Sequence, residues 1–452
     1  MKRYGLSQSM CEWERLDEWR LKIRGILGRE EVRQISPFML LALPGIGADL
    51  QRRCSELWIR EQLSEAQLAR PELCFVFGRR ERSKLRLGYL SADFHEHATA
   101  LLTAELFECH DRERFEVYAY SYGDDDGKGM RQRLEASFDR FTDIRALSAI
   151  DAARAIHGDE IDILIDLKGY TQGSRSAILG FRPAPIQVNY LGYPGTLGGD
   201  VCDYIVTDAF VTPPMSAPDY SEAFALMPDS YQPHGRHGII GEKPSRAAAG
   251  LPESGFVFCC FNQAYKITPA IFDVWCRLLL SVPDSVLWLL NTPMAEGNLR
   301  REAFHRGITA ERIVFAADWP QSEHLGRLQL ADLVVDTAPY NAHTTASDAL
   351  WAGVPIVTCA GDTFPSRVAG SLLNAIGLQE LVTGDLDEYF ELALSLAGDP
   401  DRLAALKEKL AANRMSSALF GIEAYTRHLE TLYRRMWRKH LDGEHPGAIS
   451  AV

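Results

Sequence analysis

Residues 333–359 read LVVDTAPYNAHTTASDALWAGVPIVTC. The apolar run at 333–339 predicts a buried strand, and residues 344–352 have the spacing of a helix. A second apolar run at 354–359 predicts another strand. A strand, a helix and a strand in this order form the crossover that joins two neighbouring parallel strands. This part of the chain therefore predicts a parallel sheet covered by helices.

The same alternation extends over most of the chain, in two series. Strands of the second series are also predicted at 256–261, 285–290 and 312–317, with a helix at 268–281. Strands of the first series are predicted at 86–90, 115–122, 161–167, 186–192 and 204–208, with helices at 98–110 and 148–158. A loop-rich stretch at 213–254 separates the two series. Apolar strands alternating with helices indicate doubly wound α/β domains.

The predicted domain boundaries follow from this pattern. We expect a helical N-terminal segment, two Rossmann-like domains and C-terminal helices, at 1–84, 85–235, 236–397 and 398–440. The final helix is expected to be amphipathic, and the residues after it to be disordered. Open α/β sheets bind ligands at the carboxyl ends of their strands, so we expect the two domains to face each other across a cleft.

Composition and charge exclude several classes of protein. The chain has 452 residues, of which 46% are hydrophobic and 24% charged, as in ordinary globular proteins. Its net charge of −13 disfavours binding to nucleic acid or to anionic membrane. No signal peptide is visible, and the apolar run at 38–48 is too short to span a bilayer. The nine cysteines include no Cys-x-x-Cys pair, so we expect reduced thiols in a cytoplasmic protein.

Two motifs of the second domain are suited to a phosphate ligand. Thr344 and Thr345 open a helix, where free backbone N–H groups and the helix dipole favour an anion, and Asp348 lies one turn later. Lys266 follows a strand and could neutralise the charge that develops on a departing diphosphate. The plainer explanations are ordinary helix capping by threonine and a solvated surface lysine.

In the first domain, Asp93 and His97 follow the first strand. His97 could act as an acid or base or bind substrate, and Asp93 could orient it or move a proton. The plainer explanation is a loop with exposed histidines. A metal site at His95 and His97 is less favoured, because no third ligand has suitable spacing. The Asp-x-Asp of residues 124–126 resembles a cation-binding pair but is interpreted as a solvated loop.

Together these motifs resemble one family. The matching segments are LGYLSADF at 87–94, RPAPIQ at 182–187, LGYPGT at 191–196, FNQAYK at 261–266, SVLWLL at 285–290, HTTASDALWAG at 343–353 and SRVA at 366–369. They resemble the catalytic region of the O-linked N-acetylglucosamine transferases and the related SPINDLY-type O-fucosyltransferases, glycosyltransferase family 41. The resemblance covers about residues 85–437.

The resemblance implies a GT-B fold, inversion at the anomeric carbon, no metal, and an acceptor-side first domain. Lys266 would contact the diphosphate, and His97 and Asp93 would lie by the sugar and acceptor, with Asp93 implicated in proton removal. Further residues are expected to bind the nucleotide-sugar: Gln263, His343, Thr344 and Thr345 at the phosphates, Asp348 at the ribose, and His324 and Arg327 towards the base. Thr99 is also expected at this site, and the backbone of Leu191 and Gly192 would touch the sugar.

Three departures from the family pattern are visible. No tetratricopeptide repeat array is recognisable here, so a separate repeat-containing protein that recruits acceptors is one candidate partner. Ser36 stands where animal members carry a histidine, and Gln321 where some members have a lysine. These departures bear on acceptor choice, activity and base preference.

The preferred function is transfer of N-acetylglucosamine from its UDP donor to Ser or Thr of a protein. One alternative keeps this chemistry with GDP-fucose or UDP-glucose. A second is a non-catalytic module that binds a nucleotide-sugar or docks a partner, and a third is a sugar-nucleotide epimerase. Retention of Asp93, His97 and Lys266 favours an enzyme.

Overall fold

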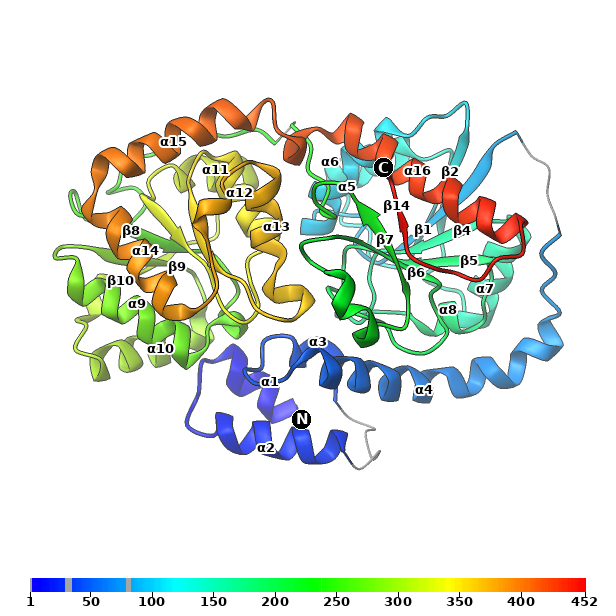
Figure 1. Ribbon diagram of the computed structural model, residues 1–452, viewed down its shortest axis with the longest axis horizontal. Coiled ribbons are helices and arrows are strands. Elements are labelled where there is room, and N and C mark those ends of the chain that lie inside the picture. Colours follow the sequence, from blue (N-terminus) through cyan, green and yellow to red (C-terminus); the bar gives the residue numbers. More distant parts are fainter. Residues whose placement is uncertain (1, 29–34, 79–82, 237) are drawn as a thin grey trace. The chain divides into compact units, whose positions relative to one another are not determined.

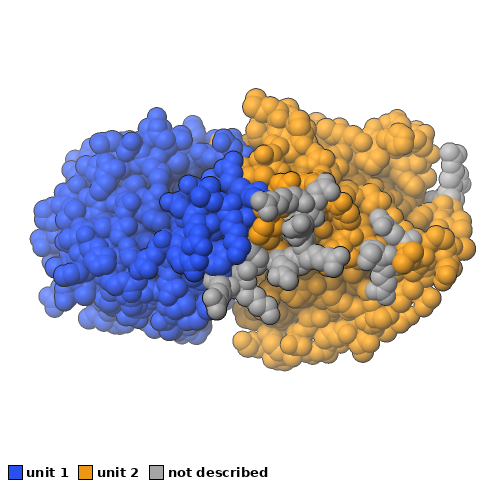
Figure 2. Space-filling model, turned by 90° about the horizontal axis from the view of Figure 1, so that it is seen from below, with its two compact units in different colours: residues 1–25, 41–46, 236–420 blue, residues 26–40, 47–235, 421–452 orange. Residues whose placement is uncertain are grey.

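Parallel strands form two separate sheets in the structure, a computed structural model that describes residues 2–28, 35–78, 83–236 and 238–452. Each sheet belongs to one of two compact units, which Figure 2 shows in different colours. Unit 1 comprises Met1–Gly25, Leu41–Ile46 and Arg236–Phe420. Unit 2 comprises Ile26–Leu40, Gly47–Gly235 and Gly421–Val452.

The sheet of unit 2 has eight strands among the described residues, in the order β14-β7-β6-β5-β4-β1-β2-β3. They are β1 (Leu85–Ser91), β2 (Phe115–Ser121), β3 (Arg140–Asp143), β4 (Ile163–Asp166), β5 (Ile186–Asn189), β6 (Tyr204–Asp208), β7 (Ala223–Met227) and β14 (Ile449–Ser450). The helices of this unit are α3 (Pro37–Leu40), α4 (Ala48–Leu73), α5 (Ala98–Cys109), α6 (Gly129–Ser137), α7 (Ala149–Gly158), α8 (Ala177–Gly180), η1 (Pro214–Asp219) and α16 (Ile422–Leu441).

The sheet of unit 1 has six strands in the described part of the chain, in the order β10-β9-β8-β11-β12-β13. They are β8 (Val257–Cys260), β9 (Val286–Leu290), β10 (Ile313–Ala316), β11 (Leu333–Val335), β12 (Ile356–Cys359) and β13 (Val382–Thr383). Its α-helices are α1 (Lys2–Ser9), α9 (Pro269–Ser281), α10 (Pro293–His305), α11 (Gln321–Leu328), α12 (Thr344–Trp351), α13 (Val368–Ala375), α14 (Leu386–Gly398) and α15 (Pro400–Arg414). Its 3-10 helices are η2 (Ala264–Lys266), η3 (Ala310–Arg312), η4 (Phe364–Ser366), η5 (Gln379–Leu381) and η6 (Ala418–Phe420), and α2 (Leu16–Leu27) begins in unit 1 and ends in unit 2.

Both sheets follow the same strand order. Numbered from the first strand of each unit, the order 3-2-1-4-5-6 describes all of the unit 1 sheet and the first six strands of unit 2. This is the order of the Rossmann fold, so the predicted pair of doubly wound α/β domains is confirmed. The order reverses between β8 and β11 in unit 1 and between β1 and β4 in unit 2. Loops that follow these four strands flank the crevice in which such sheets bind ligands.

Large aromatic side chains contribute to the core of unit 1. Trp275 of α9 and Trp288 of β9 are almost fully buried, as is Tyr389 of α14. The Tyr389 hydroxyl donates to the backbone oxygen of Asp336 at 3.0 Å and accepts from Trp275 Nε1 at 3.3 Å. These contacts hold α9 and α14 against each other (Figure 1) and tie α14 to Asp336, the residue that follows β11.

In unit 2 the C-terminal helix α16 is an integral part of the core. It is amphipathic, as predicted, and it packs on α5 (Figure 1). His110 bridges the two parts, because its Nε2 lies 2.9 Å from the Tyr89 hydroxyl and its Nδ1 2.9 Å from the Glu430 carboxylate. Burial lowers the pKa of His110 despite the Glu430 charge, so the imidazole is neutral at neutral pH.

Two expectations about the chain are wrong. The stretch predicted as loop contains β7, which pairs along its whole length with β6. The C-terminal residues are not disordered, because Ile449 and Ser450 pair with β7 and the Ala451 N–H donates to Leu226 O at 3.0 Å. β14 has only two residues at the edge of the sheet, too few to show a strand pattern. β7 is the five-residue apolar run AFALM, which lies in a stretch otherwise rich in Pro, Gly and Ser.

Helices occupy most of the N-terminal segment, as expected from its charge-rich sequence. Ser36 precedes the short helix α3, where its backbone oxygen accepts from Met39 N at 3.1 Å. In the described ranges of the chain, no helix combines the length and apolarity needed to cross a membrane.

Candidate nucleotide-sugar site

The point of strand reversal in unit 1 gathers most of the residues predicted for a phosphate site. Asn262 and Lys266 follow β8, and Asp336 follows β11, its neighbour in the sheet. Thr345 of α12 donates from its hydroxyl to Asn262 Oδ1. Residues that follow β8 and β11 thus meet the start of α12 at the ligand-binding edge of the sheet.

Asp336 is the buried acceptor that organises this edge. Its Oδ1 accepts from the backbone N–H groups of Thr337 and Ala342, both at 2.7 Å, and from Asn262 Nδ2 at 3.1 Å. Its Oδ2 accepts from the Thr358 hydroxyl at 2.7 Å. Burial raises the pKa of Asp336 to about 6, although these bonds and the Lys266 charge oppose the shift.

Replacing Asp336 with alanine is therefore expected to destabilise unit 1. Four buried donors lose their acceptor, and each orphaned group costs about 1–3 kcal/mol, so we expect a loss of roughly 3 kcal/mol or more in the free energy of unfolding. Thermal and urea denaturation measure it. Asp387→Ala, at a side chain that is 88% exposed, is the matched control and should change stability by less than about 0.5 kcal/mol. Equal stabilities for the two variants would contradict this role.

Lys266 is a buried cation at this edge, not a solvated surface lysine. It is 7% exposed. Its Nζ donates to the backbone oxygen of Asn341 at 2.9 Å and lies 3.9 Å from the centre of the Tyr340 ring. Burial lowers the pKa of Lys266 to about 8, with the Asp336 charge opposing. The ammonium can supply a strong charge to an anion because little water competes for it.

The start of helix α12 is open. His343 is the N-cap residue, and its side chain accepts no hydrogen bond from the first turn, so ordinary capping by threonine is not what the structure shows. Burial and the charge of Lys266 lower the pKa of His343 well below its usual range. Its neutral ring can therefore donate from Nε2 to Pro365 O, 3.4 Å away. The N–H groups of Thr344 and Thr345 remain suited to an anion.

Asp348 lies one turn further along α12 and is 9% exposed. Gln321, the first residue of α11, lies with its Nε2 3.5 Å from Asp348 Oδ1. Burial raises the pKa of Asp348 to about 7, although the Gln321 contact lowers it. Gln321, which stands where some family members have a lysine, thus lies directly beside the predicted site residue Asp348.

His324 and Arg327 form a stacked group near the end of β8. Arg327 donates to His324 Nδ1 at 2.7 Å, and the histidine ring lies 5.2 Å from the ring of Phe261. Burial and the Arg327 charge lower the pKa of His324 to about 4, which leaves a neutral ring suited to stacking on a base. Arg327 is 1% exposed and also lies over the Trp319 ring, so its hydrogen bond holds His324 in a fixed orientation. Gln263 is exposed, and its backbone oxygen accepts from Lys266 N at 3.0 Å.

The point of strand reversal in unit 2 holds the other predicted group. Asp93, which follows β1, is 5% exposed. Its Oδ1 accepts from Lys168 Nζ at 2.5 Å, and its Oδ2 lies 3.6 Å from His97 Nδ1. Lys168 follows β4, which pairs with β1. Lys168 is not among the residues predicted for the site, although a lysine directly after a buried strand is a usable signal.

His97 is the N-cap residue of α5. Its Nδ1 accepts from the backbone N–H of Thr99 at 3.1 Å, which makes Thr99 a support for the histidine. Burial lowers the pKa of His97, with the Asp93 charge opposing and the Lys168 charge reinforcing the shift. A neutral imidazole that accepts at Nδ1 carries its proton on Nε2. His97 is therefore better suited to donate a hydrogen bond to a substrate than to take a proton from it.

The turn after β5 is held in an unusual conformation. Leu191 has a φ of 71° and Gly192 donates from its N–H to Tyr190 O at 2.9 Å. A Cβ on Gly192 would lie 2.1 Å from the backbone oxygen of Leu167. Only glycine allows this close approach, so the Leu191–Gly192 backbone is presented in one fixed form.

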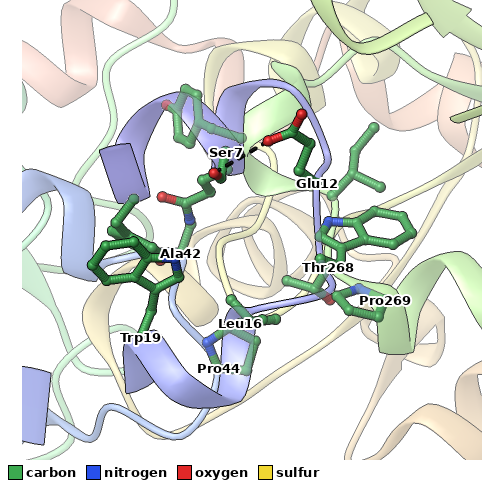
Figure 3. A pocket seen from close by; sticks show the side chains of 13 residues that line it. Ser7, Glu12, Leu16, Trp19, Ala42, Pro44, Thr268 and Pro269 are labelled. Atoms are coloured by element: carbon green, nitrogen blue, oxygen red, sulfur yellow. Dashed lines mark hydrogen bonds between the residues drawn. The ribbon is translucent and has the colours of Figure 1, made fainter. Parts of the chain in front are cut away.

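Two other features lie apart from these groups. The pocket in Figure 3 is lined by aromatic residues such as Trp13, Trp19 and Tyr265, but by none of the predicted site residues. Asp124 and Asp126 are exposed in the loop after β2. Among the residues that the structure describes, no group of three or more His, Cys, Asp or Glu side chains is gathered to hold a metal ion.

The sequence as a whole identifies the family. The pattern of glycosyl transferase family 41 matches residues 66–242 and 238–429, which is most of the chain. The chain belongs to glycosyl transferase family 41. The probable UDP-N-acetylglucosamine–peptide N-acetylglucosaminyltransferase SEC of Arabidopsis thaliana is 37% identical over 457 residues, covering 97% of this chain and 47% of that protein. The corresponding transferase of Caenorhabditis elegans is 32% identical over 474 residues, covering 80% and 41%.

This family member spans less than half the length of those two relatives. A solved structure of a mutant O-GlcNAc transferase from Thermobaculum terrenum matches with a TM-score of 0.84 at 29% identity, over 97% of this chain and 83% of that one. Sucrose-phosphate synthase from Thermosynechococcus elongatus, at 13% identity and a TM-score of 0.54 over 78% of this chain and 100% of that one, shares the fold alone. The α/β architecture is that of the GT-B glycosyltransferases.

Proposed function

We propose that this chain is an inverting glycosyltransferase that moves N-acetylglucosamine from UDP-N-acetylglucosamine to Ser or Thr hydroxyls of proteins. One observation carries the proposal. Lys266 and the open start of α12 lie together where the strand order of unit 1 reverses, the place at which such sheets bind nucleotides. The named activity of the family relatives supports the sugar and the peptide acceptor.

On the donor side, unit 1 binds the nucleotide and stabilises its departure. The diphosphate oxygens lie against the N–H groups of Thr344 and Thr345, and Lys266 neutralises the charge that grows as the bond to the sugar breaks. Asp348 accepts from ribose hydroxyls, and the neutral ring of His324 stacks on the base. The lysine and the helix start take the part that a cation plays in other sugar transferases, so we propose a metal-independent reaction.

On the acceptor side, unit 2 handles the hydroxyl. The acceptor oxygen attacks the anomeric carbon from the face opposite the diphosphate, so the bond to the phosphate breaks as the new bond forms. The hydroxyl proton passes to Asp93, directly or through water, and UDP leaves with the bonding electron pair. His97 donates from Nε2 to the sugar or acceptor, and the Leu191–Gly192 backbone contacts the sugar.

A transfer assay tests the proposal. The full chain is incubated with UDP-N-acetylglucosamine and a protein extract from cells that lack this gene product, and modified residues are mapped by mass spectrometry. A hexosamine on Ser or Thr, with anomeric configuration opposite to that of the donor, is the expected result. Parallel reactions with GDP-fucose and UDP-glucose identify a different donor, and an epimer formed without acceptor would identify an epimerase. Nucleotide-sugar binding without any product would support a non-catalytic module instead.

The affinity for UDP should fall as the pH rises above about 8. The pKa of Lys266 is lowered from 10.5 to about 8, so the ammonium is present below that pH and is lost above it. The fall attributable to one lost charge is at most about tenfold per pH unit. Calorimetric titration of the wild type and of Lys266→Arg between pH 7 and 10 measures it. Lys266→Arg keeps its charge, so its affinity for UDP should fall only to the extent that the uracil base ionises. If affinity fell equally with pH in both proteins, Lys266 would not be the group responsible.

Acceptor recruitment is the remaining part of the proposal. We propose that acceptor proteins are recruited with help from a separate repeat-containing partner. Purified chain alone should then modify short peptides and intact proteins with similar, low efficiency, whereas addition of the partner should raise only the rate on intact proteins.

A further inference from the structure

Lys168 is a buried lysine at the carboxyl end of β4. It is 6% exposed, and its Nζ lies 2.5 Å from Oδ1 of Asp93, which is itself 5% exposed. Lysine side chains normally reach solvent, and taking an ammonium out of water is costly unless a partner compensates. The sequence places this lysine where the sheet order reverses, and the fold keeps it against one carboxylate.

The backbone around Lys168 is built to hold it there. Asp166 Oδ1 accepts from the N–H of Lys168 at 3.2 Å, and Asp166 Oδ2 accepts from the N–H of Gly169 at 2.9 Å. Gly169 has a φ of 52°, and a Cβ at this position would lie 2.3 Å from Tyr193 Cβ. The turn is thus fixed both by a buried carboxylate and by a close approach that only glycine permits.

The ion pair leaves the two oxygens of Asp93 in different situations. Oδ1 is engaged by Lys168, and the N–H of Asp93 donates to the Ser91 hydroxyl at 2.9 Å, so the residue is held at two points. Oδ2 lies 3.6 Å from His97 Nδ1, which is beyond normal hydrogen-bond distance, and that nitrogen accepts from Thr99 N. Oδ2 therefore keeps lone pairs that can receive a proton.

We propose that Lys168 is a positioning residue that holds Oδ1 of Asp93 so that Oδ2 is the oxygen that receives the proton of the acceptor hydroxyl. This inference rests on the proposed function. In the step itself the hydroxyl O–H bond breaks, the proton adds to Oδ2, and it returns to solvent after UDP has left. Lys168 keeps its own protons throughout and touches no reacting atom.

The test begins with Lys168→Met, which keeps the length of the side chain and removes its charge. We expect kcat to fall about 10–100-fold, because a misplaced catalytic group costs roughly that much, while KM for UDP-N-acetylglucosamine stays within about threefold. Lys168→Arg, which restores a charged donor, should recover part of the loss. Lys128→Met, at an exposed lysine of the same unit, is the matched control and should be unchanged.

A second comparison separates positioning from general damage to the fold. If Lys168 acts through Asp93, adding Lys168→Met to Asp93→Asn should lower kcat by less than about threefold further, because the two changes remove the same function. Lys168→Met alone leaves the Asp93 carboxylate buried without its partner and can therefore fold poorly. The double variant has no such unpaired charge, so it still tests whether Lys168 acts through Asp93. UDP affinity and melting temperature are measured alongside.

The outcomes are distinct. A wild-type chain that forms no glycosylated product defeats the proposed function. A wild-type chain that transfers sugar, with Lys168→Met at full kcat, overturns the role of Lys168 alone. Losses that multiply in the double variant would also overturn it, because they would show that Lys168 acts independently of Asp93.

Discussion

Replacing Lys266 with methionine should lower kcat for sugar transfer by roughly 10²–10³-fold, because a preorganised charge aimed at a developing oxyanion contributes about that much. Methionine fills much of the same volume beside Tyr340, so the lost charge dominates the effect. Affinity for UDP should fall as well, since in the proposed mechanism the ammonium already contacts the diphosphate of the bound nucleotide before the sugar is transferred. Initial rates over a range of donor concentrations, together with calorimetric titration of UDP, measure both effects.

The matched control for this variant is Lys243→Met, at an exposed lysine of the same unit. Its kinetics and melting temperature should equal those of the wild type. Near-normal turnover of Lys266→Met would show that the helix start alone manages the diphosphate, and the assignment of Lys266 would have to be abandoned.

Replacing Asp93 with asparagine should reduce kcat by roughly 10²–10⁴-fold, the usual contribution of a positioned proton acceptor. The amide oxygen can still accept from Lys168, so the local packing should survive. KM for the donor should change little, because the proposed phosphate contacts come from unit 1. Steady-state kinetics with a glycosylated peptide product provide the measurement.

The control for this variant is Asp124→Asn, at a fully exposed side chain in the loop after β2. It makes the same chemical change and should leave activity intact. The pair also examines the Asp-x-Asp motif. If Asp124→Asn were as inactive as Asp93→Asn, that loop would have to hold a catalytic cation, and the proton would need another acceptor.

The central strands of both sheets could be predicted because they are rich in apolar residues and buried on both faces, most clearly in β8 and β9. Of the edge strands, β10 was also predicted, but β3, β13 and β14 were not. β3 consists of Arg140, Phe141, Thr142 and Asp143, and its burial pattern is largely exposed, so its sequence looks like a surface turn. β13 and β14 have two residues each, and their pairing depends on neighbours that come from elsewhere in the chain.

The site shows a similar division. Asp93, Lys266 and Thr344 could be proposed for the site because each follows a recognisable strand, where ligands bind in parallel sheets. The roles of Asp336 and Lys168 depend on which strands are neighbours, and that order is not written in any local pattern. The proton position on His97 depends on one contact with Thr99 N, which only the structure supplies.

The way the chain alternates between its two units has a consequence for synthesis and dissection. Unit 2 takes its helix α16 and edge strand β14 from residues made only after all of unit 1. During translation the edge of β7 and the surface of α5 therefore stay exposed until α16 and β14 have been synthesised. An unpaired strand edge is prone to aggregate during that time. Neither unit is formed by one continuous stretch of the chain. To express one unit alone, segments that are distant in the sequence would have to be joined by new linkers.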